Sequence, residues 1–383
     1  MSGEFLPYGR QDIDGDDIEA AVEVLKSDWL TTGPAVDAFE AALADRCDAA
    51  NAVAVNSGTS ALQAAYRAAG VGPDTQVIVP ALTFSATANA ARQLGATVQF
   101  ADICPQTLTV DPESGQKLVD ETTAVIAPVD FAGHPASIDA IAGVADAVDA
   151  TVVEDGAHSL GATIGGRPVG SVADMTIFSF HPVKAMTTGE GGAVVTGNRA
   201  LAKSVRRLRN HGMVADRSPD GDEAQAPWHY DIDEIGWNYR ITDMQCALGI
   251  SQLRRLDDFI DRRRQIAAMY RERLSSVEGL TLPPEKDWCE HAYHLFVIRV
   301  PASRRRSIFD ELRRRNIGVQ VHYIPVNMLG AYRRLGHRPE ETPETLRQYR
   351  RMISIPCFPK MTDDDVERTA QAVREVVGGG ACE

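Results

Sequence analysis

The sequence predicts an α/β protein with a mostly parallel, doubly wound sheet and a smaller C-terminal α/β domain. Two observations predict this architecture. Short apolar runs alternate with helical patterns between residues 52 and 196, which is typical of strands joined by crossover helices. The pattern then changes around residues 282–285. We therefore expect a large domain over residues 1–250 and a small domain over residues 251–383, and a chain of 383 residues, 44% of them hydrophobic, is long enough for both cores.

Composition argues against several classes of partner. The net charge is -14, with 39 Lys and Arg against 53 Asp and Glu, so we expect no nucleic acid or anionic membrane as a partner. The six cysteines are scattered without C-x-x-C spacing, which favours a reducing cytoplasm, and we expect no metal site. No apolar run approaches the roughly 20 residues needed to cross a bilayer.

The N-terminal region predicts an arm and two helices. Residues 7–11 form the arm, and a first helix follows in which apolar residues recur at helical spacing: Ile18, Ala21, Val22 and Leu25. A loop over residues 29–34 ends this helix, and a second helix passes through Phe39 and Leu43. A structural role, in which the arm packs against the rest of the protein, is enough to explain the residues of both the arm and the loop.

The strands of the large domain are predicted from short runs rich in β-branched residues. These runs are Ala52–Val55, Gln76–Val79, Val98–Ala101, Ala124–Pro128, Thr151–Glu154, Met175–Phe180 and Ala193–Thr196. Helices are expected between them, for example over residues 87–94 and 138–147. No G-x-G-x-x-G follows the first run, which argues against a dinucleotide-binding fold.

The second half of the chain begins with a polar stretch from Val214 to Tyr230. Its composition predicts a solvated loop, and a lid over a substrate site and an inert loop are equally consistent with it. The expected elements that follow are a long helix over 243–273, a strand over 294–300, a helix over 303–315, a strand over 319–323 and a helix over 363–377.

Candidate chemistry lies where predicted strands end. Lys184 follows the run that ends at Phe180 and precedes a glycine-rich loop, and open α/β sheets place their sites at this edge. A lysine there can lose solvent, lower its pKa and act as an amine nucleophile. Taken alone, Lys184 is better explained as a surface residue.

Two further features favour the chemical role. Asp155 ends the run that begins at Thr151, and an aspartate paired with a lysine is what pyridoxal phosphate requires, because the lysine carries the cofactor and the acid keeps its pyridine nitrogen protonated. Asn56–Ser60 lies between a predicted strand and a helix, where exposed amides and hydroxyls suit a phosphate. A tight turn and a helix cap would explain the same residues.

The motifs EDGAHSLGA, SFHPVKAMTTGEGG and NYRITDMQCALGISQL resemble those of the DegT/DnrJ/StrS family of sugar aminotransferases, which are fold-type I enzymes that use pyridoxal phosphate. The similarity runs from PYGRQ near the start to ISIPCFPKMT near the end. PYGRQ, LTTGPAVDAFE and NSGTSAL are most similar to the PseC-type enzymes of pseudaminic acid synthesis. That branch aminates C4 of a UDP-linked 4-keto-6-deoxy-N-acetylhexosamine, and we expect L-glutamate as the amino donor.

The resemblance implies roles for individual residues. Lys184 and Asp155 would be catalytic, and the cofactor would also contact Gly58, Thr59, Phe84, His158, Ser179 and, from the neighbouring subunit of a homodimer, Asn238. The sugar nucleotide would contact Tyr8, Trp29, Leu30, Thr31, Thr32, Ser57, His322, Tyr323, Ile324 and Pro325. From the residue types alone, Phe84 would be core, Asn238 a helix cap and His322 structural, and many relatives have glutamine at the position of His158.

Other functions remain open from the sequence. A branch of the same family removes a hydroxyl group from the sugar and has histidine in place of the lysine, so Lys184 argues against it. A regulatory binding protein would tolerate loss of the Lys184 and Asp155 pair, and both residues are present. Aminotransferases for dTDP- or GDP-linked 4-keto-6-deoxyhexoses, or for a UDP-4-keto-pentose, share the same motifs and fold.

Overall fold

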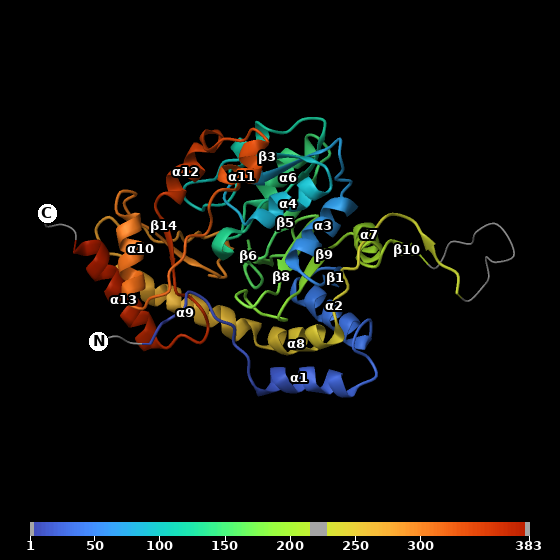
Figure 1. Ribbon diagram of the computed structural model, residues 1–383, viewed down its shortest axis with the longest axis horizontal. Coiled ribbons are helices and arrows are strands. Elements are labelled where there is room, and N and C mark those ends of the chain that lie inside the picture. The colour runs from blue at the N-terminus through green and yellow to red at the C-terminus, as the bar shows by residue number, and fades with distance from the viewer. Residues whose placement is uncertain (1–3, 215–227, 380–383) are drawn as a thin grey trace.

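The computed structural model describes residues 4–214 and 228–379. A seven-stranded sheet forms its centre, with helices on both faces (Figure 1). In their order across the sheet the strands are β1 (Asn51–Val55), β9 (Gly192–Thr196), β8 (Met175–Ser179), β5 (Thr151–Asp155), β4 (Thr123–Ile126), β2 (Gln76–Pro80) and β3 (Thr97–Ala101). Only β9 runs antiparallel to its neighbours β1 and β8, so the predicted mostly parallel α/β sheet is confirmed.

Burial on both faces explains the composition of these strands. β2 and β9 are buried along their whole lengths, and their valines, isoleucines and alanines pack against helices on either side. The helices of this part are α1 (Gly15–Lys26), α2 (Pro34–Arg46), α3 (Gly58–Ala68), α4 (Ser85–Gln93), α5 (Pro112–Gln116), α6 (Ile138–Asp146), α7 (Arg199–Arg209) and α8 (Asp243–Arg254).

The C-terminal part has a separate apolar core. Its helices and strands are α9 (Leu256–Leu274), β13 (Phe296–Arg299), α10 (Arg305–Arg314), α11 (Gly330–Arg334), α12 (Pro343–Tyr349), β14 (Met352–Ile355) and α13 (Asp363–Gly378). β13 pairs antiparallel with β14, and the core lies between this pair and α9, α10 and α13. Figure 1 shows α10, α13 and β14 at one end of the molecule and α11 and α12 nearer β3, with α8 and α9 running end to end beneath the sheet.

Short elements complete the described chain. They are β6 (Thr163–Ile164), β7 (Arg167–Pro168), β12 (Cys289–Glu290), β10 (Met213–Val214), β11 (Asp231–Ile232) and the 3-10 turns Phe131–Gly133, Val326–Met328 and Pro339–Glu341. β10 and β11 pair with each other and flank the polar stretch for which the sequence predicts either a lid or an inert loop. Residues 215–227 of that stretch lie outside the described residues.

Two expectations about the second half were wrong in detail, and one strand was not expected. The helix expected over 243–273 is two helices, because Arg255 leaves helical geometry (φ -102°, ψ 4°) and binds the α1 acids Asp14 and Asp17. The strand expected over 319–323 pairs only at Gln320, which bridges Ser354 on the edge of β14 opposite to β13. The next N–H, that of Val321, donates to the side chain of Gln320 instead of to β14. The sequence reasoning did not predict β14 at all.

The apolar residues of α1 also behave unexpectedly. Ile18 is 59% exposed and Leu25 is 58% exposed, although their helical spacing is typical of a core-facing stripe. α1 packs on α8 through the buried Asp17, whose carboxylate accepts hydrogen bonds from Gln252 and Arg255. A polar contact therefore docks this helix, and its apolar stripe faces outward in the single chain.

Candidate active site

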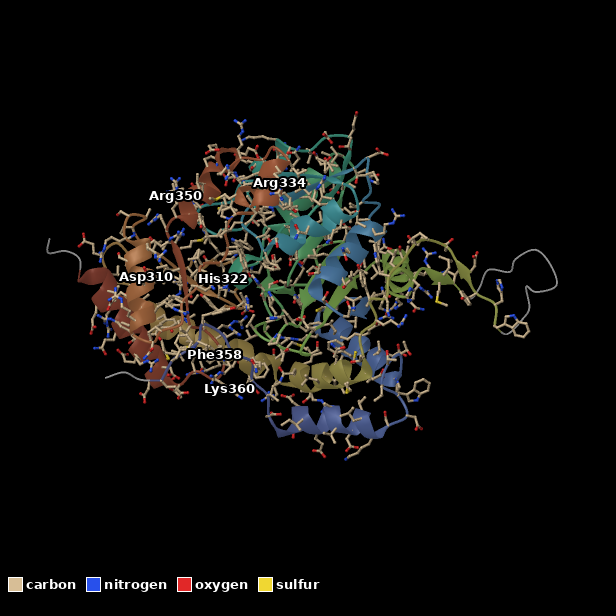
Figure 2. All side chains as sticks on the ribbon, viewed as in Figure 1. Asp310, His322, Arg334, Arg350, Phe358 and Lys360 are labelled. Atoms are coloured by element: carbon tan, nitrogen blue, oxygen red, sulfur yellow. The ribbon has the colours of Figure 1, made fainter. Side chains whose placement is uncertain are left out.

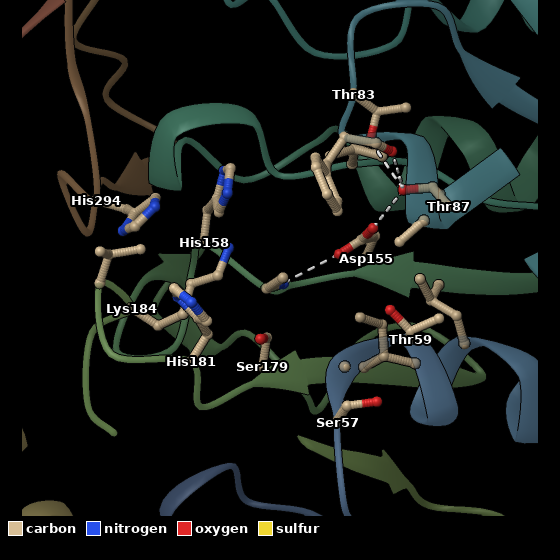
Figure 3. Close-up of a pocket in the computed structure, with 18 of the residues that line it drawn as sticks. Ser57, Thr59, Thr83, Thr87, Asp155, His158, Ser179, His181, Lys184 and His294 are labelled. Atoms are coloured by element: carbon tan, nitrogen blue, oxygen red, sulfur yellow. Dashed lines mark hydrogen bonds between the residues drawn. The ribbon is translucent and has the colours of Figure 1, made fainter. Parts of the chain in front are cut away.

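A cavity of about 380 Å³ opens at the end of the sheet where β5 and β8 finish. The N-terminus of α3, the start of α4 and segments of the C-terminal part complete its walls. This is the edge at which parallel sheets place ligands, and the volume is in the range of small-molecule sites. Figure 3 shows polar side chains from these elements directed into the same space.

Lys184 lies in the turn that follows β8. Its backbone N–H donates to the carbonyl of His181 at 2.9 Å, which closes the turn and directs the side chain into the cavity. Burial lowers the pKa of the Lys184 amine to about 8, and the charge of Asp155 opposes this effect. About a tenth of the amine is therefore unprotonated at pH 7, far more than for a lysine with the ordinary pKa of 10.5, and this neutral form is what a nucleophile or base requires.

Asp155 ends β5 and is 6% exposed. Its Oδ2 accepts a hydrogen bond from Oγ1 of Thr87 at 2.7 Å, and its Oδ1 accepts one from the N–H of Ala157 at 3.2 Å. Burial raises the pKa of this carboxyl, whereas Thr87, Lys184 and Ala157 lower it. The two hydrogen bonds orient the carboxylate and favour its charged form.

The N-terminus of α3 lies beside these residues and suits an anion. Ser57 caps the helix by accepting from the N–H of Ser60 at 3.1 Å, and the N–H groups of the first turn lie at the positive end of the helix dipole. A Cβ atom at Gly58 would lie 2.8 Å from Cβ of Ser179, so only glycine allows this close approach. Ser179 and Thr59 add hydroxyl groups to the same wall.

Histidines line the opposite wall. The rings of His158 and His294 lie 4.2 Å apart between centroids, and the Tyr323 hydroxyl bonds Nε2 of His158 at 3.2 Å. Burial lowers the pKa of both imidazoles well below the ordinary value, so both are neutral. Nδ1 of His158 and Nδ1 of His294 are buried and have no partner within the described residues.

These groups fit pyridoxal phosphate. An amine, a carboxylate and a helix N-terminus converge on one cavity and match the cofactor's aldehyde, its ring nitrogen and its phosphate. The two unpartnered imidazole nitrogens beside them are consistent with a polar ligand that supplies their missing hydrogen bonds.

Eleven of the residues predicted from the sequence line this cavity. They are Tyr8, Ser57, Gly58, Thr59, Phe84, Asp155, His158, Ser179, Lys184, His322 and Tyr323. His322 donates to or accepts from Ser354 at 2.8 Å, and burial lowers its pKa to about 4. Figure 2 places His322 between the C-terminal elements and the central sheet.

Seven predicted residues do not line the cavity of the single chain. They are Trp29, Leu30, Thr31, Thr32, Asn238, Ile324 and Pro325. Thr31 bridges Thr242, and the Asn238 backbone bridges Asn210. Trp29 is 55% exposed, so its side chain is available to another molecule.

The sequence reasoning missed several lining residues, of which Thr87 and His294 are the clearest. Thr87 lies in the first turn of α4, and its hydroxyl reaches Asp155 from a different crossover unit. His294 precedes β13, and its backbone carbonyl accepts from the buried Arg263 at 3.2 Å. A hydroxyl in the helix turn after β2 is a sequence signal for Thr87, whereas no local pattern indicates that His294 meets His158.

Residues 4–214 and 228–379 contain neither a helix that could span a membrane nor a cluster of metal ligands. No helix there has the length and apolar character needed to cross a bilayer. No group of three or more His, Cys, Asp or Glu residues there is arranged to hold a metal ion.

Comparison with known proteins agrees with this geometry. The model of the DegT/DnrJ/EryC1/StrS aminotransferase family matches residues 11–374. The chain is 39% identical over 381 residues to the spore coat polysaccharide biosynthesis protein SpsC of Bacillus subtilis, covering 98% of each chain. It is 36% identical over 386 residues to the UDP-4-amino-4,6-dideoxy-N-acetyl-beta-L-altrosamine transaminase of Campylobacter jejuni, covering 98% of this chain and all of the relative.

A solved structure gives the same result. The putative sugar aminotransferase Spr1654 from Streptococcus pneumoniae, in its PLP-form, superimposes with a TM-score of 0.90 at 30% identity, covering 97% of this chain and 98% of that one. Its PMP-form superimposes with a TM-score of 0.91. The chain therefore belongs to the DegT/DnrJ/EryC1/StrS aminotransferase family and is a pyridoxal-phosphate-dependent sugar aminotransferase of fold type I.

Proposed function

We propose that the enzyme transfers the amino group of L-glutamate to C4 of a nucleotide-linked 4-keto-6-deoxy sugar. The preferred substrate is UDP-2-acetamido-2,6-dideoxy-beta-L-arabino-hexos-4-ulose, an intermediate of the pseudaminic acid pathway. The observation that carries the reaction type is the convergence of Lys184, Asp155 and the N-terminus of α3 on one cavity. The similarity to the Campylobacter transaminase over 98% of the chain supports the choice of sugar.

In this proposal Lys184 moves the protons. Its amine, with a pKa lowered to about 8, takes the proton from Cα of the bound glutamate and later returns a proton to C4 of the sugar. When bound, pyridoxal phosphate supplies an electron sink for the charge left on carbon and carries the amino group between the two substrates. Since the substrates share one site, ping-pong kinetics are expected.

The remaining cavity residues hold and orient the ligands. Asp155 holds the cofactor ring nitrogen in its protonated form, and Thr87 fixes that carboxylate at 2.7 Å. Gly58, Thr59 and Ser179 bind the phosphate at the start of α3, and Phe84 and His158 contact the ring. Tyr8, Ser57, His322 and Tyr323 face the sugar nucleotide, and the walls of the cavity exclude water from the reacting atoms.

We further propose a homodimer in which each subunit completes the site of the other. Large apolar side chains are exposed around α1 and at the mouth of the cavity, among them Leu25, Trp29 and Leu30, and Phe84 is 59% exposed. Trp29, Leu30, Thr31, Thr32 and Asn238 lie outside the cavity of their own chain, so they act on the partner's site. Ile324 and Pro325 follow Tyr323 and contact the nucleotide end of the substrate.

The dimer is tested with two inactive partners. Lys184→Ala and Asn238→Ala chains are mixed after separate purification and allowed to exchange subunits. If Asn238 acts on the partner's site, each mixed dimer has one intact site. At statistical exchange half of the dimers are mixed, so the mixture should regain about a quarter of the activity of the same amount of wild-type enzyme. No gain over the Asn238→Ala enzyme alone, or an active monomer by light scattering, contradicts shared sites.

The division into residues 1–250 and 251–383 is also a proposal. It is supported by the break between α8 and α9, since α8 packs on α1 and α2 whereas α9 packs on α13. The boundary lies within four residues of Arg254, where α8 ends.

The substrate is tested by visible absorption. Enzyme loaded with pyridoxal phosphate should lose its visible band when L-glutamate is added and regain it with one sugar of a panel that contains UDP-, dTDP- and GDP-linked 4-keto sugars. Recovery with a dTDP or GDP sugar alone would replace the proposed substrate by that of a related branch. If the protein binds the cofactor but no visible band forms, the assignment of Lys184 is wrong.

A further inference from the structure

Two buried acids lie directly behind the active site. Glu154 precedes Asp155 on β5, and because successive side chains of a strand point to opposite faces, Glu154 faces away from the cavity that Asp155 faces. Its neighbour there is Asp130, in the loop after β4, and each of the two carboxyl groups shifts the pKa of the other. Both side chains have an exposed fraction of 0%.

The hydrogen bonds of the pair show where a proton is needed. Asp130 uses both oxygens as acceptors, Oδ1 from the N–H of Ala136 at 2.8 Å and Oδ2 from the Ser159 hydroxyl at 2.5 Å. Glu154 accepts only at Oε2, from the Thr176 hydroxyl at 2.6 Å, and its Oε1 has no donor within the described residues. Two ionised groups would leave Oε1 facing another carboxylate, whereas a proton on Oε1 makes it a donor to Asp130.

The surroundings favour one shared proton. Burial raises the pKa of both carboxyl groups, that of Glu154 to about 7 and that of Asp130 well above its ordinary value, so the pair keeps a proton. The larger rise is that of Asp130, but both Asp130 oxygens already accept hydrogen bonds, so the hydrogen bonds place the proton on Glu154. The titratable groups coupled to the pair are Asp155 on the same strand, Cys47 after α2 and Cys289 in β12. None of them is a cation, so a second negative charge in this place would be uncompensated.

The pair is bonded to the backbone that carries active-site residues. The N–H of Asp130 donates to the carbonyl of Asp155 at 3.1 Å. Ser159, which is bonded to Asp130, follows His158 and closes the turn by donating its N–H to Gly156 at 3.0 Å. A change in the position or protonation of Asp130 and Glu154 would therefore move both ends of the turn from Asp155 to Ser159.

We propose that Asp130 and Glu154 share one proton, held on Oε1 of Glu154, and that this pair positions the turn that presents Asp155 and His158 to the cofactor. The proposal rests on the roles of Asp155 and His158 in the proposed function. Glu154 and Asp130 are positioning residues, because they act through the backbone and do not line the cavity.

Two isosteric variants test where the proton lies. Glu154→Gln places an NH2 group at the position of the protonated oxygen and keeps the acceptor for Thr176. Asp130→Asn replaces one of two acceptors by a donor, so the Ala136 or Ser159 bond is lost. At pH 5 we expect a urea midpoint near that of wild type for Glu154→Gln and a lower midpoint for Asp130→Asn. Equal loss in both variants would overturn the assignment of the proton.

The pH dependence of unfolding tests whether the proton is shared. A carboxyl whose pKa is raised in the folded state stabilises the fold below the unfolded pKa, and this stabilisation is lost as pH rises through the folded pKa. Between pH 5 and pH 8 the wild-type folding constant should fall by roughly 70-fold on this account, whereas Glu154→Gln should lack that fall. The control is Glu23→Gln, whose side chain is 60% exposed, and it should keep the wild-type pH dependence. A wild-type pH dependence in Glu154→Gln would overturn the shared proton.

A kinetic readout separates positioning from stability. In the glutamate half-reaction, kcat/KM of the wild-type holoenzyme should have an alkaline limb from loss of the shared proton, and Glu154→Gln should shift or remove that limb. An unchanged profile would overturn the positioning role. The unfolding experiments use neither sugar nor glutamate, so their result does not depend on the proposed substrate. If the proposed substrate is wrong, the absorption test shows it and the unfolding results still stand.

Discussion

Oγ1 of Thr87 donates a 2.7 Å hydrogen bond to Oδ2 of Asp155 and so joins the first turn of α4 to the end of β5. Both side chains are buried, Thr87 at 0% and Asp155 at 6% exposure. Burial alone would favour the neutral acid, and this bond is the largest of the effects that lower the Asp155 pKa. The charged form of Asp155, which its proposed contact with the cofactor ring requires, is therefore favoured by a residue of a neighbouring crossover unit.

Thr87→Val should weaken binding of pyridoxal phosphate. A hydrogen bond to a charged group contributes about 1.5–3 kcal/mol, so we expect a dissociation constant about 10- to 100-fold higher, measured by equilibrium dialysis. Thr83→Val is the matched control, because Thr83 bonds Oγ1 of Thr87 at 2.9 Å and does not bond Asp155. Equal effects of the two variants would contradict a specific role for the bond to Asp155.

The reaction of cofactor-free enzyme with pyridoxal phosphate should depend on pH through Lys184. Only the neutral amine attacks the aldehyde, so the rate should rise with pH around a midpoint of about 8, followed by stopped-flow absorbance. Because Asp155 raises the pKa of Lys184, Asp155→Asn should move this midpoint lower. A midpoint near the ordinary lysine value of 10.5 would show that the amine is solvated.

The lowered pKa of Lys184 also predicts how protein stability changes with pH, and the change is opposite in sign to the one expected for Asp130 and Glu154. Lys184 is neutral in the folded protein at pH values where it is still charged in the unfolded chain, so the unfolded state binds more protons there. Its contribution to the free energy of unfolding should therefore rise as pH increases from about 8 to the ordinary lysine pKa. Urea midpoints of cofactor-free Lys184→Met should lack this rise, with Lys360→Met as an exposed control.

Gly58→Ala should disturb the phosphate site. The new Cβ would lie 2.8 Å from Cβ of Ser179, closer than real Cβ contacts, so the start of α3 must move away from β8. We expect at least about a tenfold loss of cofactor affinity from misplaced N–H donors. Gly143→Ala is the control, since it lies inside α6 with nothing within 4 Å of the added Cβ, and it should stabilise its helix by up to about 1 kcal/mol.

Tyr323→Phe should change the orientation of the His158 ring more than the stability of the fold. The Tyr323 hydroxyl bonds Nε2 of His158 at 3.2 Å across the boundary between the two parts of the chain. Its loss should cost about 1 kcal/mol and lower kcat/KM about fivefold, because the neutral imidazole is then free to change its orientation. Tyr349→Phe keeps the ring that stacks with Arg305 and serves as the control. An unchanged pH profile and kcat/KM in Tyr323→Phe would show that the hydrogen bond between Tyr323 and His158 has no role in the reaction.

Much of the fold and the centre of the site could be predicted from local patterns. Strand-like runs that end at Asp155 and Ser179, and the glycine-rich loop after Lys184, are local features, and parallel strands necessarily bring their carboxyl ends to one edge. Lys184, Asp155 and the start of α3 could therefore be placed together before any coordinates. The family motifs then supplied the cofactor.

Tertiary structure decided the partners of these residues. Thr87 reaches Asp155 over 68 positions of sequence, and His294 meets His158 from the C-terminal part. The hydroxyl of Thr87 has a local signal at the start of a helix, but its partner has none, and the meeting of His294 with His158 has no local signal at all. The pairing of β13 with β14 and the break at Arg255 likewise depend on which distant surfaces pack together. Periodicity in a sequence indicates which face of an element is apolar, but the energy that selects its neighbour comes from burial of both surfaces at once.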